Sequence, residues 1–236
     1  MSDPRLSRRA FLRAGAALAP LGLAACGWDG GRAIRPALAG VSRLNDWVGE
    51  RLISHSRLAR EYPVADRNPN FPSYFISDRT PVLADPSAWA LNVAGAVRKP
   101  MRLTLDQLKA LPRLTYTVKH HCVEGWTAIA TWTGVPLTAV AALVEPTADA
   151  RYLRFDSFDE DYFNGWDLTS AMHPQTILAY AYNDRPLMPD HGAPVRLYSP
   201  IKLGYKLTKY LTSVTFTRSR PGGYWEDQGY PWLGGV

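Results

Sequence analysis

The sequence predicts an α+β domain with mixed and antiparallel sheets. Strand-like segments, in which apolar and polar residues alternate, are interspersed with short helical segments, and they lack the regular strand–helix–strand order of a doubly wound fold. Of the 236 residues, 46% are hydrophobic, which is enough to form the core of one ordinary domain or of two small ones. This composition excludes a disordered, collagen-like or coiled-coil protein.

Residues 1–25 predict a twin-arginine signal peptide. Arg8 and Arg9 stand before an uncharged run over 14–25, which is too short to span a bilayer and has the length of a signal-peptide core. A buried N-terminal helix is the alternative, but the paired arginines favour export. We therefore expect a periplasmic protein that is exported by the twin-arginine route.

Cys26 lies at the end of this uncharged run, in a Leu-Ala-Ala-Cys segment that resembles a bacterial lipobox. The resemblance predicts cleavage before Cys26 and a lipid anchor on this cysteine, whereas ordinary signal cleavage nearby is the alternative. Residues 26–40 are rich in Gly and Ala and are predicted to form a tether. The folded domain is expected over 41–236.

This domain opens with a predicted helix and a long irregular segment. Apolar residues recur at helical spacing from Leu44 to Leu52, which predicts an amphipathic helix over 42–60. Residues 63–87 contain repeated Pro, Asn, Asp and Ser, and they predict an irregular segment. Long ordered loops in compact domains are usually functional, so this segment is a candidate part of a site.

Short strands and helices follow. Alternating apolar residues predict a strand at 89–93, and Thr104 with Gln107 forms a capping-box pattern that begins a short helix, which Pro112 ends. Alternation at 114–118 predicts a strand that leads directly into a His-His-Cys sequence. The remaining predicted elements are a turn at 132–137 that leads into a helix through Leu143, and strands at 151–157, 195–199 and 211–217.

Charge and cysteine content exclude several function classes. The formal net charge is +6, and about half of it lies in the first 25 residues, so nucleic-acid binding is not indicated. Neither a Gly-rich dinucleotide fingerprint nor a Walker motif is present. Cys26 and Cys122 are the two cysteines, which excludes a disulfide scaffold, a multi-cysteine zinc or iron–sulfur site, and covalent c-type haem.

Cys122 is the candidate centre of the chemistry. It follows His120 and His121 at the end of a predicted strand, in a polar sequence context. A thiolate is a soft ligand that suits a transition metal. Two alternatives remain open from the residues alone: a buried and inert cysteine, and a Cys/His nucleophile for acyl transfer, for which no papain-like pattern is present.

Spaced sequence blocks carry a resemblance to a known family. They are His-His-Cys-Val-Glu-Gly-Trp at 120–126 with Trp-x-Gly-Val-Pro-Leu at 132–137, His-Gly-Ala-Pro-Val-Arg at 191–196, and Lys-x-Gly-Tyr-Lys-x-x-Lys at 202–209. Together they resemble the sulfite-oxidase superfamily of molybdopterin enzymes over about residues 65–220, and within it the branch of periplasmic protein-methionine-sulfoxide reductase catalytic subunits. The resemblance implies the sulfite-oxidase-type fold and a molybdenum–molybdopterin cofactor without an attached nucleotide.

The resemblance also implies roles for individual residues. Cys122 matches the cysteine that completes the coordination of molybdenum. Arg196 and Lys209 match phosphate-binding positions, and forked guanidinium bonds and a lysine charge are suited to phosphate. The other positions that match cofactor contacts are the amides of Leu207 and Thr208, His191, Ser157, and Asn68 with Asn70 as its rival.

The chain departs from the family pattern on both sides of the cysteine. Sulfite oxidases have Cys-Ala-Gly-Asn-Arg, whereas Val123 to Trp126 follow the cysteine here, which favours the reductase branch. That branch usually has an arginine just before the cysteine, where this chain has His120 and His121. We predict that these histidines are catalytic, as proton donors that titrate near neutrality, as groups that bind an anionic substrate, or as pterin contacts. On an extended segment one should face the metal and the other point away.

The implied activity is oxygen-atom transfer that reduces an S-oxide, such as free or protein-bound methionine sulfoxide, or an N-oxide. Electrons are expected from an external protein, either a membrane haem b subunit or a c-type cytochrome, and the chain is expected to be a monomer. The alternatives are a sulfite-oxidising enzyme and a non-catalytic module with a degenerate site. Intact Cys122, Arg196 and Lys209 argue against degeneracy.

Overall fold

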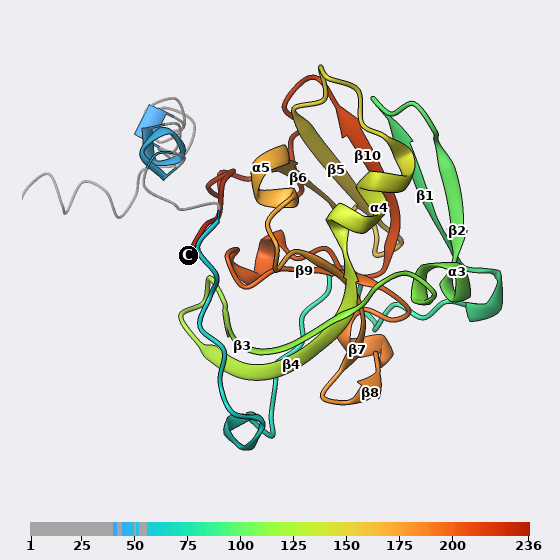
Figure 1. Cartoon of the computed structure of the whole chain (residues 1–236). Coiled ribbons are helices and arrows are strands. Elements are labelled where there is room, and N and C mark those ends of the chain that lie inside the picture. Colours follow the sequence, from blue (N-terminus) through green and yellow to red (C-terminus); the bar gives the residue numbers. More distant parts are fainter. Residues whose placement is uncertain (1–39, 42–43, 50, 52–55) are drawn as a thin grey trace, which may run out of the picture. The chain divides into compact units, whose positions relative to one another are not determined.

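The computed structural model describes residues 40–41, 44–49, 51 and 56–236 (Figure 1). One compact unit extends from Ser42 to Val236. The predicted signal peptide over 1–25 and nearly all of the predicted tether over 26–40 lie outside the described residues. Within the described part, no helix is both long and apolar enough to cross a membrane.

The first sheet is mixed. Its strand order is β2-β1-β10-β5-β6; β1 and β10 run parallel, and the other neighbours are antiparallel. β10 occupies the residues predicted from their alternation, and its Val214 and Phe216 are buried in the core. The strands are β1 Ala90–Gly95, β2 Met101–Thr104, β5 Tyr152–Ser157, β6 Phe163–Asp167 and β10 Leu211–Thr217.

The second sheet is antiparallel. Its order is β3-β4-β7-β8, and β9 also pairs with β7. A long hairpin of β3 and β4 dominates it and is seen in the lower part of Figure 1. The two sheets confirm the predicted α+β class with mixed and antiparallel pairing. The strands are β3 Leu114–His121, β4 Thr127–Pro136, β7 Ile177–Tyr182, β8 Arg185–Pro186 and β9 Arg196–Tyr198.

Short helices connect the strands. The predicted capping box is confirmed, because the Thr104 hydroxyl accepts from the Gln107 amide at 3.2 Å and the Gln107 side chain accepts from the Thr104 amide at 2.9 Å. The α-helices are α3 Leu105–Lys109, α4 Leu137–Val144 and α5 Leu168–Ala171, and the 3-10 helices are η2 Val64–Asp66, η3 Pro86–Ala88, η4 Pro189–His191 and η5 Gly204–Lys206.

The turn predicted at 132–137 is wrong, because residues 132–136 belong to β4. β4 pairs with β3 on one side and with β7 on the other, and this pairing outweighs the turn tendency of Gly134 and Pro136. Gly134 lies where a Cβ atom would collide with the carbonyl oxygen of Leu178, so close strand packing explains the glycine.

The predicted N-terminal helix is shorter than expected and docks differently. Residues 44–49 and 51 are helical, whereas 56–60 are not. Leu44 and Trp47 of the predicted apolar face are 58% and 52% exposed. Asp46 is buried instead, and its carboxylate accepts from the Arg220 guanidinium at 2.6 Å and from the Leu233 amide at 2.9 Å. A charge-assisted polar contact therefore holds this helix.

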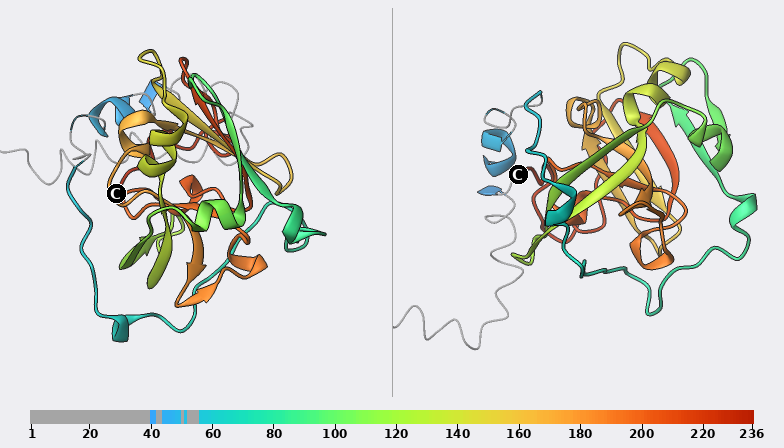
Figure 2. Two further views of the ribbon diagram at one scale, coloured as in Figure 1. Left: turned by 45° about the vertical axis from the view of Figure 1, so that its right-hand side comes forward. Right: turned by 60° about the horizontal axis from the view of Figure 1, so that its bottom comes forward.

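The irregular segment after this helix runs along the β3–β4 hairpin to the site. The Tyr62 amide donates to the Thr117 carbonyl at 2.8 Å, and the Asn68 amide donates to the Ile129 carbonyl at 2.9 Å. The segment, drawn in teal in Figure 2, then passes on from the hairpin toward β1. As predicted, it is irregular apart from two short 3-10 turns, and part of it lines the cavity described next.

Candidate active site

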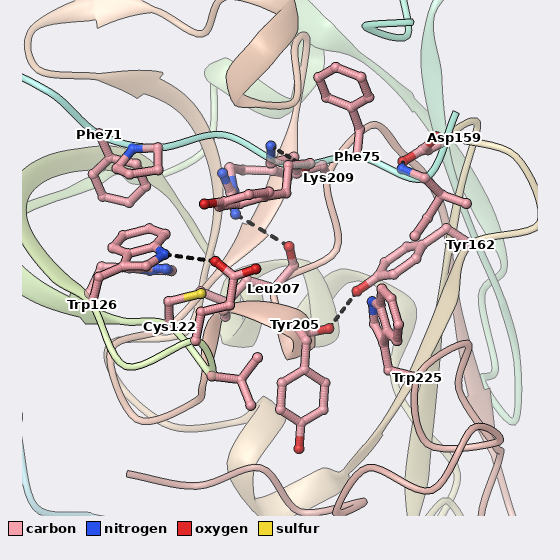
Figure 3. Close-up of a pocket in the computed structure, with 18 of the residues that line it drawn as sticks. Phe71, Phe75, Cys122, Trp126, Asp159, Tyr162, Tyr205, Leu207, Lys209 and Trp225 are labelled. Atoms are coloured by element: carbon pink, nitrogen blue, oxygen red, sulfur yellow. Dashed lines mark hydrogen bonds between the residues drawn. The ribbon is translucent and has the colours of Figure 1, made fainter. Parts of the chain in front are cut away.

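A cavity of about 370 Å³ lies beside the turn of the β3–β4 hairpin (Figure 3). Segments that are far apart in the sequence form its wall, so it exists only in the folded chain. In Figure 3, Phe71 and Trp126 lie on the left of the cavity, and Tyr162 and Trp225 on the right. The lining residues are Phe71, Pro72, Tyr74, Phe75, Ile76, His120, Cys122, Val123, Glu124, Trp126, Asp159, Tyr162, Arg196, Gly204, Tyr205, Leu207, Lys209, Trp225 and Tyr230.

Cys122 sits in this wall, at the first position of the hairpin turn. Its amide donates to the Trp126 carbonyl at 3.0 Å, and its carbonyl accepts from the Gly125 amide at 3.1 Å. Gly125 has a φ of 89°, which glycine adopts readily. Burial, more than the nearby Glu124 charge, raises the pKa of the Cys122 thiol. A cation at the sulfur would reverse this shift and favour the thiolate.

The two histidines before the cysteine alternate as predicted. His120 is buried and lines the cavity, whereas His121 is half-buried and is not among the lining residues. The His120 ring packs against Phe71 and Trp126, with ring centroids 4.9 and 5.3 Å apart. Burial first, and then the charge of Arg196, lowers the pKa of His120 to about 3. The imidazole is therefore neutral in this site, and its pKa is not near neutrality as the sequence analysis expected.

Arg196 brings a buried cation to the cavity. It is 3% exposed, and its guanidinium donates to the carbonyls of His191 at 3.0 Å and Leu207 at 3.3 Å. Its Nε has no partner. Burial lowers the pKa of Arg196 to about 10, so the group remains charged at neutral pH. A buried charge of this kind requires a counter-ion, and the cavity is where one can bind.

Lys209 adds a second cation on the same side. Its Nζ donates to the Ser73 hydroxyl at 2.7 Å, to the Tyr74 carbonyl at 2.7 Å and to the Asp190 carbonyl at 2.8 Å. Burial, with repulsion from Arg196, lowers the pKa of Lys209 to about 7. A phosphate between the two cations would relieve this repulsion, as expected for phosphate-binding positions.

The predicted asparagine and serine contacts lie outside the lining set. Asn68 is exposed, and its side-chain oxygen accepts from the Ile129 amide at 2.6 Å, so it fastens the irregular segment to β4. Asn70 is exposed. The Ser157 hydroxyl donates to the Lys209 carbonyl at 2.8 Å and accepts from the Asp159 amide at 2.9 Å. Ser157 therefore supports Lys209 from behind.

The remaining predicted contacts surround Arg196 and Lys209. His191 is buried beside Tyr182, with ring centroids 4.5 Å apart, and its Nδ1 has no partner. Thr208 is fully buried, and its hydroxyl has no partner either. Leu207 lines the cavity, but its amide donates to the Gly204 carbonyl at 3.1 Å. This amide, predicted to bind phosphate, is thus used within the η5 turn.

Unpartnered polar atoms test whether a pterin cofactor fits. Buried polar groups normally have a hydrogen-bond partner. Within the described part of the chain, several that lack one belong to lining residues or to their close neighbours. They are His120 Nδ1, His191 Nδ1, Arg196 Nε, Thr208 Oγ1 and Tyr210 OH. A ligand with phosphate oxygens and a heterocycle rich in acceptors and donors matches this set, whereas a purely apolar ligand does not.

The protein offers few ligands to a metal. Among the described residues, no group of three or more His, Cys, Asp or Glu side chains is suited to hold a metal ion. Cys122 is the described free thiol, and it lines the cavity. A metal at this site therefore needs most of its ligands from a cofactor, which agrees with a single cysteine completing the coordination of a pterin-bound metal.

Sequence reasoning missed the aromatic wall and one buried carboxylate. Tyr162, which directly precedes β6, lines the cavity together with Trp225 and Tyr230 of the C-terminal segment. Asp159 is buried, and its carboxylate accepts from the amides of Ile76 at 2.7 Å and Ser77 at 2.9 Å, which fixes the loop that covers the site. The density of aromatic residues near the C-terminus was a signal for this wall, but nothing in the spacing linked it to Cys122.

The mixed fold and a cavity lined by one thiol and two cationic side chains are what a cofactor-dependent oxidoreductase domain requires. The chain belongs to the family of oxidoreductase molybdopterin-binding domains, which matches residues 78–225. The protein is an enzyme, and its cofactor is molybdenum–molybdopterin. The family, the fold and the cofactor predicted from the sequence blocks are thereby confirmed.

Two relatives of this chain are named as subunits of protein-methionine-sulfoxide reductases. The chain is 40% identical over 232 residues to the putative protein-methionine-sulfoxide reductase subunit YedZ1 of Azospira oryzae, covering 97% of this chain and 88% of that one. It is 29% identical to the protein-methionine-sulfoxide reductase catalytic subunit MsrP of Campylobacter jejuni over 59% of this chain, and it spans about half (52%) of that relative.

A solved structure supports the fold. The sulfane dehydrogenase SoxCD from Paracoccus pantotrophus is similar with a TM-score of 0.56, covering 59% of this chain and 40% of that one. The two sequences are 21% identical, so this likeness concerns the sulfite-oxidase-type fold alone.

Proposed function

We propose that this chain is the catalytic subunit of a methionine-sulfoxide reductase. It reduces free or protein-bound methionine sulfoxide to methionine, with two electrons and two protons consumed and the oxygen released as water. The observation that carries the proposal is that the Cys122 turn, with Glu124 and Trp126, lines the same cavity as the cations Arg196 and Lys209. The names of the two relatives agree with this substrate class.

Each part of the wall has a role in this proposal. Cys122 would hold the metal as a thiolate, and its thiol would lose its proton when the metal binds. Arg196 and Lys209 bind the phosphate, and His120 offers its unpartnered Nδ1 to the ring system or to the substrate oxygen. When bound, the cofactor supplies the two-electron oxygen-atom chemistry, and the protein orients it.

The rim beside the thiol suits a sulfoxide. Glu124 accepts a hydrogen bond from the Trp126 indole at 3.1 Å, which fixes the ring at the cavity edge. Tyr74 packs near the same ring, with centroids 6.3 Å apart. Aromatic rings contact sulfur and its methyl groups favourably, so this rim can hold the substrate while water is displaced.

Export, anchoring and the electron donor extend the proposal. The paired arginines Arg8 and Arg9 favour transport by the twin-arginine route to the periplasm, and Cys26 favours a lipid anchor. A monomer anchored in this way would receive electrons one at a time from a membrane haem b subunit or a c-type cytochrome.

A paired assay tests the activity. Protein that is exported from a molybdenum-replete host should oxidise reduced viologen when methionine sulfoxide is added, and Cys122→Ser should abolish this activity while the fold is retained by circular dichroism. The second assay measures the oxidation of sulfite with ferricyanide as the electron acceptor. Robust sulfite oxidation without reduction of any sulfoxide or N-oxide would contradict the proposal and favour a sulfite-oxidising enzyme.

A further inference from the structure

The C-terminal segment Arg220–Val236 forms one wall of the cavity, and the predicted cofactor contacts do not involve it. The family match ends at residue 225, so most of this segment lies beyond it. Trp225 and Tyr230 both line the cavity, with ring centroids 5.2 Å apart. Tyr230 also packs against Tyr205, with centroids 5.3 Å apart. The three rings make a continuous aromatic surface.

A buried ion pair holds this segment in place. The Lys206 ammonium pairs with the Glu226 carboxylate and donates to the Gly165 carbonyl at 2.8 Å. The side chains of Lys206 and Glu226 are only 1% and 4% exposed. Loss of either partner would leave the other charge buried and unpaired, so the pair strongly disfavours displacement of the segment.

Further contacts fix both ends of the turn that carries the two aromatic residues. The Tyr224 amide donates to the Phe163 carbonyl of β6 at 3.0 Å, and the Tyr205 hydroxyl donates to the Pro231 carbonyl at 2.5 Å. The Tyr230 amide closes the turn by donating to the Trp225 carbonyl at 3.1 Å. The two rings are therefore pre-organised and need little ordering when a ligand binds.

The two sides of the cavity differ in chemistry. Arg196, Lys209 and the unpartnered polar atoms described above suit the polar cofactor. Trp225 and Tyr230 line the cavity, and neither is among the described residues with a buried polar atom that lacks a partner. In Figure 3, Tyr205 and Trp225 lie across the cavity from Lys209. The aromatic side is therefore free to contact apolar parts of a substrate.

We propose that Trp225 and Tyr230 are specificity-determining residues that bind the apolar groups attached to the sulfoxide sulfur. Lys206 and Glu226 are positioning residues that hold these rings at the cavity. The inference rests on the proposed sulfoxide reductase function and adds to it a preference for sulfoxides with large apolar substituents.

Sulfoxides of increasing size test this preference with the molybdenum-loaded enzyme. For Trp225→Ala and Tyr230→Ala, we expect kcat/KM to fall about tenfold for methyl p-tolyl sulfoxide and for methionine sulfoxide. For dimethyl sulfoxide, which is too small to reach the wall, the fall should be less than about twofold. The molybdenum content should equal that of the wild type. Trp225→Phe and Tyr230→Phe should retain the wild-type order of substrates.

Matched variants separate positioning from general damage. Glu226→Ala should reproduce the size-dependent loss, and Glu226→Gln, which keeps an acceptor for Lys206, should restore most of the selectivity. Gln228→Ala is the control, because Gln228 is an exposed residue of the same segment and is not a lining residue.

Three outcomes would overturn the inference. Unchanged selectivity in both alanine variants, in an enzyme whose wild type reduces sulfoxides, refutes the inference alone. Loss of molybdenum in Trp225→Ala would assign the ring to the cofactor instead. If the wild type reduces no sulfoxide at all, the proposed function fails, and this inference fails with it.

Discussion

Arg196 shows how a single buried residue defines the site. It is nearly inaccessible, yet the Nε atom of its guanidinium has no partner, and the ring of Trp132 lies 5.0 Å from its charge centre. A charge in such an environment is unfavourable unless an anion binds beside it. The residue thus stabilises the cofactor-bound state more than the empty one.

Replacing Arg196 tests this role. Arg196→Met removes the charge and its forked hydrogen bonds at similar volume, and hydrogen bonds to charged groups contribute about 1.5–3 kcal/mol each. We expect the molybdenum content of purified Arg196→Met, measured by elemental analysis, to be at least about tenfold lower than that of the wild type. The exposed Arg102→Met is the control. Full molybdenum content in Arg196→Met would contradict a phosphate-binding role.

Lys209 predicts a pH dependence of the cofactor-free protein. Burial and Arg196 lower its pKa to about 7, whereas an unfolded lysine titrates at about 10.4. Between these values the unfolded chain binds more protons than the folded one, so the free energy of unfolding rises with pH. The melting temperature should therefore rise more from pH 7 to pH 9 in the wild type than in Lys209→Met.

The same melting experiment contains its control. Lys202 and Lys206, whose pKa values burial lowers to about 8, are present in both proteins and contribute equally. Lys109 is exposed, so the melting temperature of Lys109→Met should rise with pH as much as that of the wild type. An equal rise of melting temperature with pH in the wild type and in Lys209→Met would show that folding does not lower the pKa of Lys209.

At the scale of elements, the β3–β4 turn positions the thiol. A Cβ at Gly125 would meet no atom within 4 Å, so Gly125→Ala tests backbone conformation alone. Forcing a non-glycine residue to a φ of 89° should destabilise the protein by about 1 kcal/mol and lower the molybdenum content. Gly229, with a φ of 102° and equally open surroundings, provides the matched Gly229→Ala control. An equal loss of molybdenum in both variants would refute a specific role of the hairpin turn.

Local signals predicted some elements well. The capping box of Thr104 and the alternation at 211–217 depend on neighbours in the sequence, and both are confirmed. β4 was mistaken for a turn because its Gly134 and Pro136 are turn residues in isolation, and pairing with β7, some 45 residues further along the chain, overrides that tendency. β6 and β7 have no counterpart among the predicted strands.

The candidate site was likewise predicted only where sequence motifs encode it. The family blocks correctly brought His120, Cys122, Arg196 and Lys209 to one cavity. Asp159 and the aromatic wall depend on contacts between distant segments, such as the ion pair of Lys206 with Glu226, that no local pattern encodes. Asn68 and Ser157 support the site from behind its wall, a distinction that needs the packing itself.

For the complete chain, the sequence around Cys26 predicts a lipid anchor. If Cys26 is lipidated, the processed protein should sediment with membranes, and Cys26→Ala should appear in the soluble periplasmic fraction with unchanged activity. Mass spectrometry of the N-terminus is the measurement. An unmodified N-terminus downstream of Cys26 would contradict the lipid anchor and leave export to be tested by replacing Arg8 and Arg9.

We propose that Cys122 is the protein ligand of a molybdenum cofactor held by Arg196 and Lys209. X-ray absorption at the molybdenum edge tests it most directly, with wild type and Cys122→Ser loaded in the same host. We predict that the variant retains molybdenum and loses one sulfur neighbour from the metal, because the phosphate-binding cations are intact. An identical sulfur shell in both proteins, or the absence of molybdenum from the wild type, would contradict ligation by Cys122.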